Sequence, residues 1–320
     1  MLCLATLMAP QLARAADAPP APRDYPSKPI RVVVPYAAGG PMDYIARMVG
    51  RKMQNLVVLV IDNRPGAGGA LGSDIVAKAA PDGYTMLHTS SSHASLPVIT
   101  KSLPYDPIKD FTPITLIVNS VGFLFVAHPS VPARTVQEFI AGAKAQPGKF
   151  TYGSGGVGNV MHFAAEIFNL TAGTQVTHVP YKGVAQAITD LLGGRIDVCF
   201  GPATILLPQI RAGKIKALGI TASGRWSELP EVPTIDEAGV KGYLFVPWYG
   251  FWFPARAPGA HVNWVRNEMV KALADPETSR AFADQGFVAA GSTPAEFAKI
   301  IAAEIDANRR LAAKIGLTPE

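Results

Sequence analysis

Two parts of this chain alternate strand-like and helix-like segments, and this repetition limits the possible folds more than any other feature. In the first part, strands are expected at Ile30–Val34, Val57–Ile61 and Tyr84–His88. A helix with one apolar face follows the first strand, and a second helix ends at Lys78. Strand–helix–strand order is typical of a parallel sheet covered by helices.

The same plan returns near residue 150. The expected elements are, in chain order, strand Phe150–Tyr152, helix Val160–Leu170, strand Val176–Val179, helix Val184–Leu192 and strand Ile196–Phe200. Two α/β units of this kind would leave a cleft at the carboxyl ends of their strands, which is where open α/β sheets bind ligands.

The two lobes are expected to be joined by two crossings of the chain. Extended segments at Ile114–Val118 and Phe123–Ala127 lead into the second lobe, and the chain returns near Tyr243–Trp248. The C-terminal part is helical, with apolar residues at helical spacing over Pro294–Ile315, and should pack back onto the first lobe. We therefore assign residues 24–124 and 246–320 to the first lobe, and residues 125–245 to the second.

Composition excludes several classes of protein. Of the 320 residues, 48% are hydrophobic and 17% are charged, which allows large cores and argues against intrinsic disorder. The 29 basic and 24 acidic residues leave a net charge of +5, and no run gathers five Lys or Arg residues, so we expect no nucleic-acid binding. Cys199 lies in an apolar run and is expected to be a core thiol.

The first residues are similar to an export signal. The short apolar stretch Leu2–Met8 is followed by Ala13-Arg14-Ala15, an A-x-A pattern typical of signal-peptidase sites. We expect residues 1–15 to be a signal peptide cleaved between Ala15 and Ala16, which predicts a periplasmic protein. The usual basic n-region is missing, so the alternatives are an apolar tail or a native start upstream of Met1.

The loops after the strands carry the predicted chemistry. The first ends in Gly39-Gly40-Pro41-Met42-Asp43 and places backbone N–H groups at the start of a helix, where the helix dipole favours an anion. Asp43 either caps this helix or contacts the ligand directly. The third loop, Thr89-Ser90-Ser91-Ser92-His93, offers neutral donors, although Ser clusters are also ordinary turn material.

The second lobe repeats this arrangement. Gly153-Ser154-Gly155-Gly156-Val157-Gly158 follows a strand and satisfies G-x-G-x-x-G. A dinucleotide site would need an acidic residue at the end of the next strand, which instead ends Thr177-His178-Val179-Pro180. What remains is a glycine loop whose amides and Ser154 hydroxyl face an anion. Two such loops on opposing lobes suggest a ligand with two anionic ends.

Enzyme motifs are missing from the sequence. It contains no G-x-S-x-G, H-E-x-x-H or G-x-x-x-x-G-K-[ST] pattern, and we expect no metal and no cofactor. The best enzymatic alternative is a periplasmic hydrolase or isomerase acting on an organic acid, with Ser91 or Ser154 paired with His93 or His162.

A series of ordered motifs resembles one family, the extracytoplasmic solute receptors of tripartite tricarboxylate transporters, known as Bug-type receptors. The motifs are Arg64–Gly69, Ala80–Thr85, Leu103–Pro107, Lys109–Phe111, His178–Gly183, Leu191–Val198, Ala212–Leu218 and Leu229–Thr234. The resemblance runs from about Tyr25 to the C-terminus. It implies a two-lobe, type II-like periplasmic binding protein, in which each lobe is a mainly parallel sheet flanked by helices and a hinge allows closure.

The resemblance also implies a function and a site. The receptor would be a monomer that closes on an organic acid and delivers it to a membrane permease of two further subunits; it would not be an enzyme. The same closure would serve a sensor that presents its ligand to a signalling partner. The implied ligand-binding residues are Tyr36, Ala37, Ala38, Gly39, Gly40, Met42, Asp43, Ser90, Ser91, Ser92, His93, Ser154, Gly155, Gly156, Gly158, Asn159, Tyr181, Lys182 and Gly183. The aromatic run Trp248–Phe253 adds Trp248 as a further candidate, although a strand that fills a core accounts for most of this run.

Two departures from the family pattern affect the expected ligand. Met42 stands where the first loop usually has a threonine, and the run after Cys199 reads Phe200-Gly201-Pro202-Ala203-Thr204 instead of carrying an Asp-Asn pair. Both make the cleft less polar, and Trp248 or Tyr249 would add an aromatic wall. We therefore expect a less polar mono- or dicarboxylate, with aromatic acids among the candidates, rather than citrate or malate.

Overall fold

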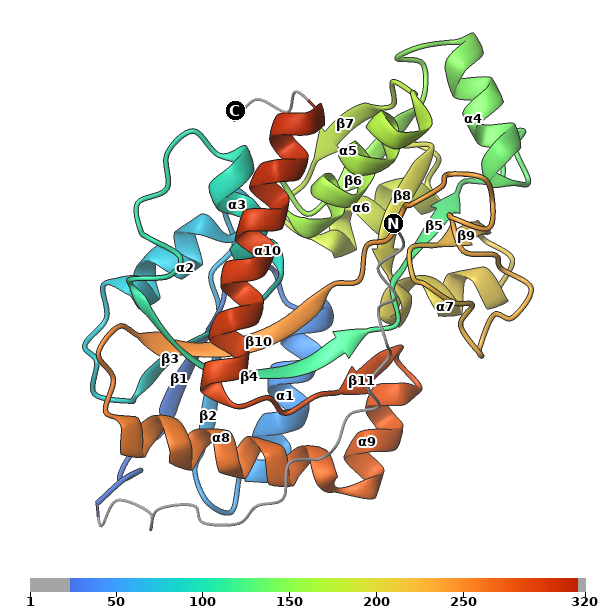
Figure 1. The fold of residues 1–320 in the computed structure, drawn as a ribbon. Helices are drawn as coiled ribbons and strands as arrows, with labels where there is room; N and C mark the ends of the chain where they lie inside the picture. Colours follow the sequence, from blue (N-terminus) through green and yellow to red (C-terminus); the bar gives the residue numbers. More distant parts are fainter. Residues whose placement is uncertain (1–23, 316–320) are drawn as a thin grey trace, which may run out of the picture.

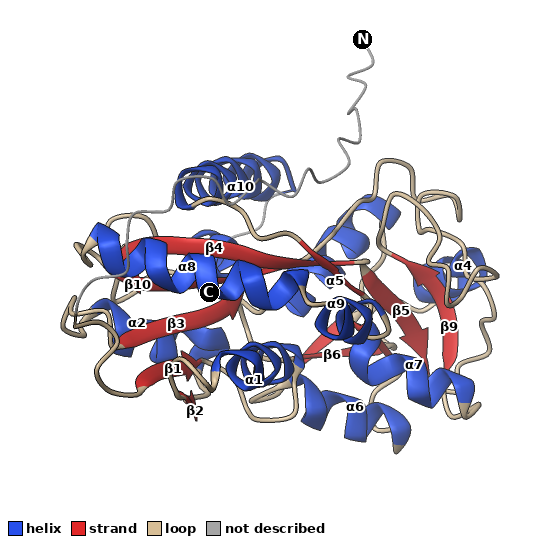
Figure 2. Cartoon of the chain, turned by 90° about the horizontal axis from the view of Figure 1, so that it is seen from below, coloured by secondary structure: helices blue, strands red, loops and turns tan. Residues whose placement is uncertain are grey.

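The computed structural model describes residues 24–315, which form two sheets flanked by helices (Figures 1 and 2). The six-stranded sheet has the order β11-β4-β10-β3-β1-β2, and the five-stranded sheet has the order β7-β6-β8-β5-β9. The strands of the first sheet are β1 (Ile30–Val34), β2 (Leu59–Asn63), β3 (Thr85–Ser90), β4 (Phe111–Ser120), β10 (Trp248–Pro254) and β11 (Phe287–Ala289). Those of the second are β5 (Phe123–Ala127), β6 (Thr151–Ser154), β7 (Thr177–Pro180), β8 (Val198–Pro202) and β9 (Lys216–Ile220).

The expected two-lobe α/β fold is confirmed, with the correction that both sheets are mixed rather than mainly parallel. Strands β3, β1 and β2 are parallel, as are β8, β6 and β7. The strands at the crossings run against their neighbours, since β10 is antiparallel to both β3 and β4, and β5 is antiparallel to both β8 and β9. The reason is topological. A strand that enters a lobe from the junction runs opposite to strands whose carboxyl ends face that junction.

Helices cover both faces of the first sheet. Helix α1 (Pro41–Met53) and helix α8 (Gly259–Ala274) share an apolar core with one face. On the other face, residues of α2 (Ala70–Ala77), α3 (Ser92–Ile99) and α10 (Pro294–Ile315) share the second core. As expected, the C-terminal part packs onto the first lobe, and α10 has the predicted bounds. Its long rod lies across β4 and beside α3 (Figure 1).

The remaining helices surround the second sheet or complete the first lobe. They are the short 3-10 helix η1 (Ala67–Gly69), α4 (Val136–Ala145), α5 (Val160–Ala172), α6 (Val184–Leu192), α7 (Ala203–Arg211) and α9 (Pro276–Ala283). Cys199 is fully buried in the core of the second lobe, as predicted. Among the helices between residues 24 and 315, none is both long enough and apolar enough to cross a membrane.

The two crossings lie side by side and are hydrogen-bonded to each other. The Ser120 N–H donates to the carbonyl oxygen of Pro247 at 2.8 Å. The Thr221 hydroxyl accepts the Phe123 N–H at 2.7 Å and donates to the Phe245 carbonyl at 2.5 Å. These bonds join the strands that pass between the lobes.

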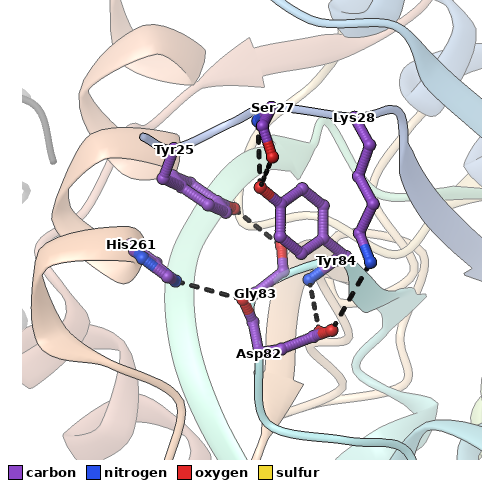
Figure 3. A network of polar contacts seen from close by, with 7 residues as sticks. All are labelled: Tyr25, Ser27, Lys28, Asp82, Gly83, Tyr84 and His261. Atoms are coloured by element: carbon purple, nitrogen blue, oxygen red, sulfur yellow. Dashed lines mark hydrogen bonds and ion pairs between the residues drawn. The ribbon is translucent and has the colours of Figure 1, made fainter. Parts of the chain in front are cut away.

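The start of the described chain is tied down on the first lobe (Figure 3). The Tyr25 hydroxyl donates to the Gly83 carbonyl at 2.7 Å, and the Tyr25 ring stacks on His261 with 3.8 Å between ring centroids. Ser27 is hydrogen-bonded to the Tyr84 hydroxyl through its N–H at 2.9 Å. The expected signal peptide, residues 1–15, lies outside the described residues.

Candidate functional site

A pocket lies between the two lobes, at the carboxyl ends of their parallel strands. It encloses about 440 Å³ of empty space, including its mouth. The enclosed cavity itself is only about 30 Å³, well below the several hundred Å³ that hold a bound small molecule. The lining residues are Tyr36, Ala37, Gly40, Pro41, Met42, Asp43, Ser90, Phe123, Asn159, Val160, Met161, Val184, Pro202 and Tyr249.

The first lobe contributes the start of α1. Gly40 is the N-cap residue, and the amides of Met42 and Asp43 lie in the first turn, where no preceding helical carbonyl is available to accept them. The Asp43 carboxylate does not bond to the N-cap residue. It accepts the Gly39 N–H at 3.1 Å and the Arg47 Nε–H at 3.0 Å, so it holds the loop that approaches the pocket.

Asp43 is buried yet ionised. Burial raises its pKa, but hydrogen bonds from Arg47 and from the Gly39 N–H outweigh burial and hold the pKa of Asp43 below its usual range. Asp43 is therefore not the N-cap of α1, which is Gly40; its carboxylate holds the preceding loop and lines the pocket.

The second lobe contributes the start of α5. Asn159 is the N-cap, and its Oδ1 accepts the Met161 N–H at 2.9 Å, while its side chain also interacts with the Tyr36 hydroxyl at the pocket wall. The preceding loop turns sharply because Gly156 and Gly158 have φ values of +120° and +83°. A side chain is strained in this region of φ, so the glycines are needed for the turn.

Ser154 stabilises the second-lobe loop from inside. Its hydroxyl is fully buried and donates to the Gly156 carbonyl at 3.1 Å, while the Gly156 N–H donates back to it at the same distance. The Ser154 Oγ also lies 2.6 Å from the His178 Nε2. The predicted anion contact through the Ser154 hydroxyl is not seen, since this hydroxyl does not reach the pocket.

Helix N-termini converge on the pocket from both lobes. Besides α1 and α5, the first residue of α6, Val184, and the N-cap residue of α7, Pro202, lie in the wall. Helices α1 and α6 meet at the junction of the lobes (Figure 2). None of the described lining residues is Lys, Arg or His. The positive ends of the helix dipoles, rather than cationic side chains, thus supply the field that attracts an anion.

Much of the remaining wall is apolar. Met42 and Met161 enter from opposite lobes, Phe123 comes from the first crossing, and Tyr249 comes from the return strand. The side chains of these four residues are buried. Thioether and aromatic side chains pack against hydrocarbon better than against hydroxyl groups, because an unpaired hydroxyl in such a wall loses its hydrogen bonds to water.

Two predicted site residues point elsewhere. His93 is buried, its Nε2 lies 2.7 Å from the Pro107 carbonyl, and its ring packs against Phe111 and Trp252 inside the first lobe. Trp248 is buried on the α10 side, where its indole N–H donates to Glu304. Neighbouring residues of a strand point to opposite faces of the sheet. Of the two aromatic candidates, Tyr249 therefore lines the pocket and Trp248 does not.

The other predicted residues lie around the pocket without lining it. Lys182 is exposed, and the Tyr181 hydroxyl donates to Asp190 at 2.7 Å. The remaining residues of this group are Ala38, Gly39, Ser91, Ser92, Gly155, Gly156, Gly158 and Gly183. Phe123, Val160, Met161, Val184 and Pro202 also line the pocket and were not predicted from the sequence. Val160 and Met161 directly follow the glycine loop in the sequence, and this position could have indicated them as site residues.

The Ser–His pairs considered for catalysis do not form. Ser154 pairs with His178 rather than His162, and the two imidazole rings stack with 4.1 Å between centroids. Burial lowers the pKa of His162 to about 4; burial, followed by the neighbouring His162, lowers that of His178 to about 3. Both imidazole rings therefore stay neutral and stabilise the glycine loop. The described residues also contain no group of three or more His, Cys, Asp or Glu side chains placed to hold a metal.

Comparison with known proteins gives a consistent result. The family model described as "Tripartite tricarboxylate transporter family receptor" matches residues 45–317. The solved structure of the periplasmic binding protein BugD is 31% identical, with a TM-score of 0.89, and the match covers 92% of this chain and 100% of that one.

Two further solved structures hold small acids. R. palustris Rpa4515 with adipate is 30% identical, with a TM-score of 0.89, over 93% of this chain and 100% of that one. MatC from Rhodopseudomonas palustris with bound malate is 30% identical, with a TM-score of 0.85, over 89% of this chain and 99% of that one.

Proposed function

Because this chain belongs to the tripartite tricarboxylate transporter receptor family, we propose that its interlobe pocket binds a carboxylate with a less polar body. The receptor role itself follows from the family: the protein captures an organic acid for a tripartite transporter and is not an enzyme. The ligand class and the groups that hold the ligand are our proposal.

One observation carries the proposal, namely the combination of converging helix N-termini with an apolar wall. The first-turn amides of α1 and the Asn159 amide are placed to receive a carboxylate without a salt bridge. Met42, Met161, Phe123 and Tyr249 are placed to cover the carbon chain or ring. A carboxylate at one end of an apolar body satisfies both features, and a second carboxylate can face the opposite lobe.

The two solved relatives are named with acids that differ in polarity. Rpa4515 is named with adipate, whose body is an unsubstituted chain, and MatC is named with malate, which carries a hydroxyl. The wall around Met42 and Met161 favours the first kind for this chain, because each buried methylene contributes about 0.8 kcal/mol while an unpaired hydroxyl costs free energy.

Calorimetric titration of the purified receptor tests this. Adipate and benzoate are expected to bind at least about tenfold more tightly than citrate or malate, a difference of roughly 1.4 kcal/mol. Tight citrate binding with no response to either of the less polar acids would overturn the proposed ligand class. Mass spectrometry of the acid after incubation serves as the control, since a receptor returns its ligand unchanged.

The remaining parts of the proposal concern location and assembly. The family implies an exported protein. We propose cleavage after Ala15, action as a monomer without nucleic acid, and delivery of the ligand to a permease of two membrane subunits. N-terminal sequencing of the exported protein and light scattering on a sizing column test the first two statements. A mature protein that starts elsewhere, or a stable dimer, would contradict them.

A further inference from the structure

Helix α3 belongs to the first lobe through its connection to β3, but its C-terminal end is buried against the second lobe. Val98 and Ile99 are almost completely buried, and they share an apolar core with residues of the second lobe. The C-terminal part of α10 braces α3, where the Asn308 side chain donates to the Ala94 carbonyl at 3.2 Å. Figure 1 shows α3 and α10 beside each other next to α5.

Two hydroxyls of α3 are hydrogen-bonded across the junction. The Ser92 Oγ accepts the Val160 N–H at 3.0 Å, which satisfies an amide in the first turn of α5. The Ser95 hydroxyl donates to the Gly158 carbonyl at 3.3 Å. Neither serine lines the pocket, but the partners of Ser92 reach it: Val160 lines the wall, and the Ser92 Oγ also accepts the hydroxyl of the pocket residue Ser90 at 3.0 Å.

A backbone contact beside α3 is equally close. At Gly68 in η1, a β-carbon would lie 2.0 Å from the Val157 carbonyl oxygen of the opposite lobe. At Gly158, a β-carbon would lie 2.5 Å from the Leu96 side chain. Real Cβ atoms essentially never approach a carbonyl oxygen so closely, so this packing between the lobes requires glycine at position 68.

We propose that the Gly68 turn and the serines of α3 form a closure latch that helps to set ligand affinity through contacts between the lobes. The latch is defined as Gly68, Ser92 and Ser95 in the first lobe with Val157, Gly158 and Val160 in the second. The proposal rests on the receptor function described above. Its physical basis is linkage: when only the closed form binds tightly, the apparent dissociation constant is divided by the closed fraction, and contacts made only on closure raise that fraction.

The Gly68 contact is tested with Gly68→Ala and the matched control Gly213→Ala. The two glycines have φ values of +61° and +67°, so alanine meets similar backbone strain at both, whereas a β-carbon at Gly213 has no atom within 4 Å. With adipate as the probe, we expect Gly68→Ala to raise the dissociation constant at least about tenfold relative to Gly213→Ala, with similar melting temperatures. Equal affinities for the two variants would overturn the latch.

The hydroxyl contact is tested with Ser92→Ala and the neighbouring control Ser91→Ala. The Ser91 Oγ is buried without a hydrogen-bond partner in the described structure. We expect about a three- to tenfold loss of adipate affinity for Ser92→Ala, mainly through faster dissociation, and rescue by Ser92→Thr, which keeps the hydroxyl. Affinities that are equal in the Ser92→Ala and Ser91→Ala proteins would contradict the role of this bond.

A measurement of shape separates the latch from the ligand assignment. Small-angle scattering of each glycine variant, with and without adipate, reports the radius of gyration, and closure makes it smaller. A larger radius for Gly68→Ala than for Gly213→Ala in either condition supports the latch, even if adipate is not the ligand. Failure of the wild-type protein to bind any acid of the panel would instead count against the proposed function alone. Identical radii in both conditions would overturn the latch.

Discussion

The Arg47 guanidinium lies 3.0 Å from the Asp43 carboxylate, so the acidic side chain that lines the pocket has its own counter-ion. Arg47 sits one turn further along α1 and is half-exposed, outside the pocket wall. This arrangement explains how a site for anions tolerates a carboxylate, because the pair presents little net charge to the ligand.

Removing the counter-ion is therefore expected to weaken anion binding. Arg47→Gln leaves the charge of Asp43 facing the ligand, and adipate affinity should fall by about three- to tenfold at low salt and by less at high salt, because salt screens the repulsion. Titration calorimetry at two ionic strengths measures this. Arg51→Gln makes the same charge change on an exposed part of α1 and should have little effect; equal losses in the two variants would show that only net charge matters.

Changing the apolar wall should change ligand preference. Met42→Thr shortens the wall and adds a hydroxyl, so the ratio of malate affinity to adipate affinity should rise by at least about tenfold. Competition titration with the two acids gives this ratio directly. Met48→Thr is the control, because Met48 packs into the core of the first lobe away from the pocket. An unchanged ratio in Met42→Thr would mean that this wall does not select the ligand.

Gly155 is predicted to act on the ligand through Asn159. A β-carbon at Gly155 would lie 3.1 Å from the Asn159 Nδ2, so Gly155→Val should displace the amide from the pocket wall. We expect about a tenfold or greater loss of adipate affinity with an unchanged circular dichroism spectrum. Gly224→Val meets no atom within 4 Å and should bind normally. Full affinity in Gly155→Val would exclude the Asn159 amide as a ligand donor.

Glu304 is expected to make stability depend on pH. Burial raises the pKa of Glu304 to about 7, although the hydrogen bond from Trp248 opposes this. A carboxyl with a raised pKa in the folded state binds more protons there than in the unfolded chain, so its stabilising contribution is lost as pH rises from about 4.5 to about 7.

The Glu304→Gln substitution removes this loss of stability at high pH. Its melting temperature should exceed that of the wild type by about 2–4 °C at pH 8 and match it at pH 4. Scanning calorimetry at the two pH values makes the comparison, with the exposed Asp306→Asn on the same helix as the control. A melting temperature for Glu304→Gln below that of the wild type at pH 8 would mean that the ionised carboxylate stabilises the fold.

Several elements were predictable because their signals are local. The apolar spacing of residues 294–315 follows the helical repeat, and α10 has those bounds. The β-branched run at residues 30–34 forms β1. Most later strands begin one or two residues beyond the expected positions, because pairing partners decide where a strand starts. In β2, for example, Leu59 is opposite Ile30.

The direction of side chains was harder to predict. His93 and Trp248 were expected at the ligand and are instead buried within the first lobe, where His93 bonds to Pro107 and Trp248 to Glu304. Composition and spacing identify a polar loop or an aromatic strand. They do not indicate which face of the strand or helix meets the cleft, because that depends on the position of distant elements.

The two α/β lobes and the glycine loops of the candidate site were predictable from local patterns, since periodic apolar residues and turn residues act over a few positions. The mixed strand directions, the wall of Met42 with Met161, and the contact between Gly68 and Val157 come from the packing of distant segments. The strand directions follow from the chain topology, whereas the wall and the Gly68–Val157 contact depend on how far one lobe rotates toward the other. That rotation is set by the sum of many weak contacts between segments remote in sequence, which no local pattern records.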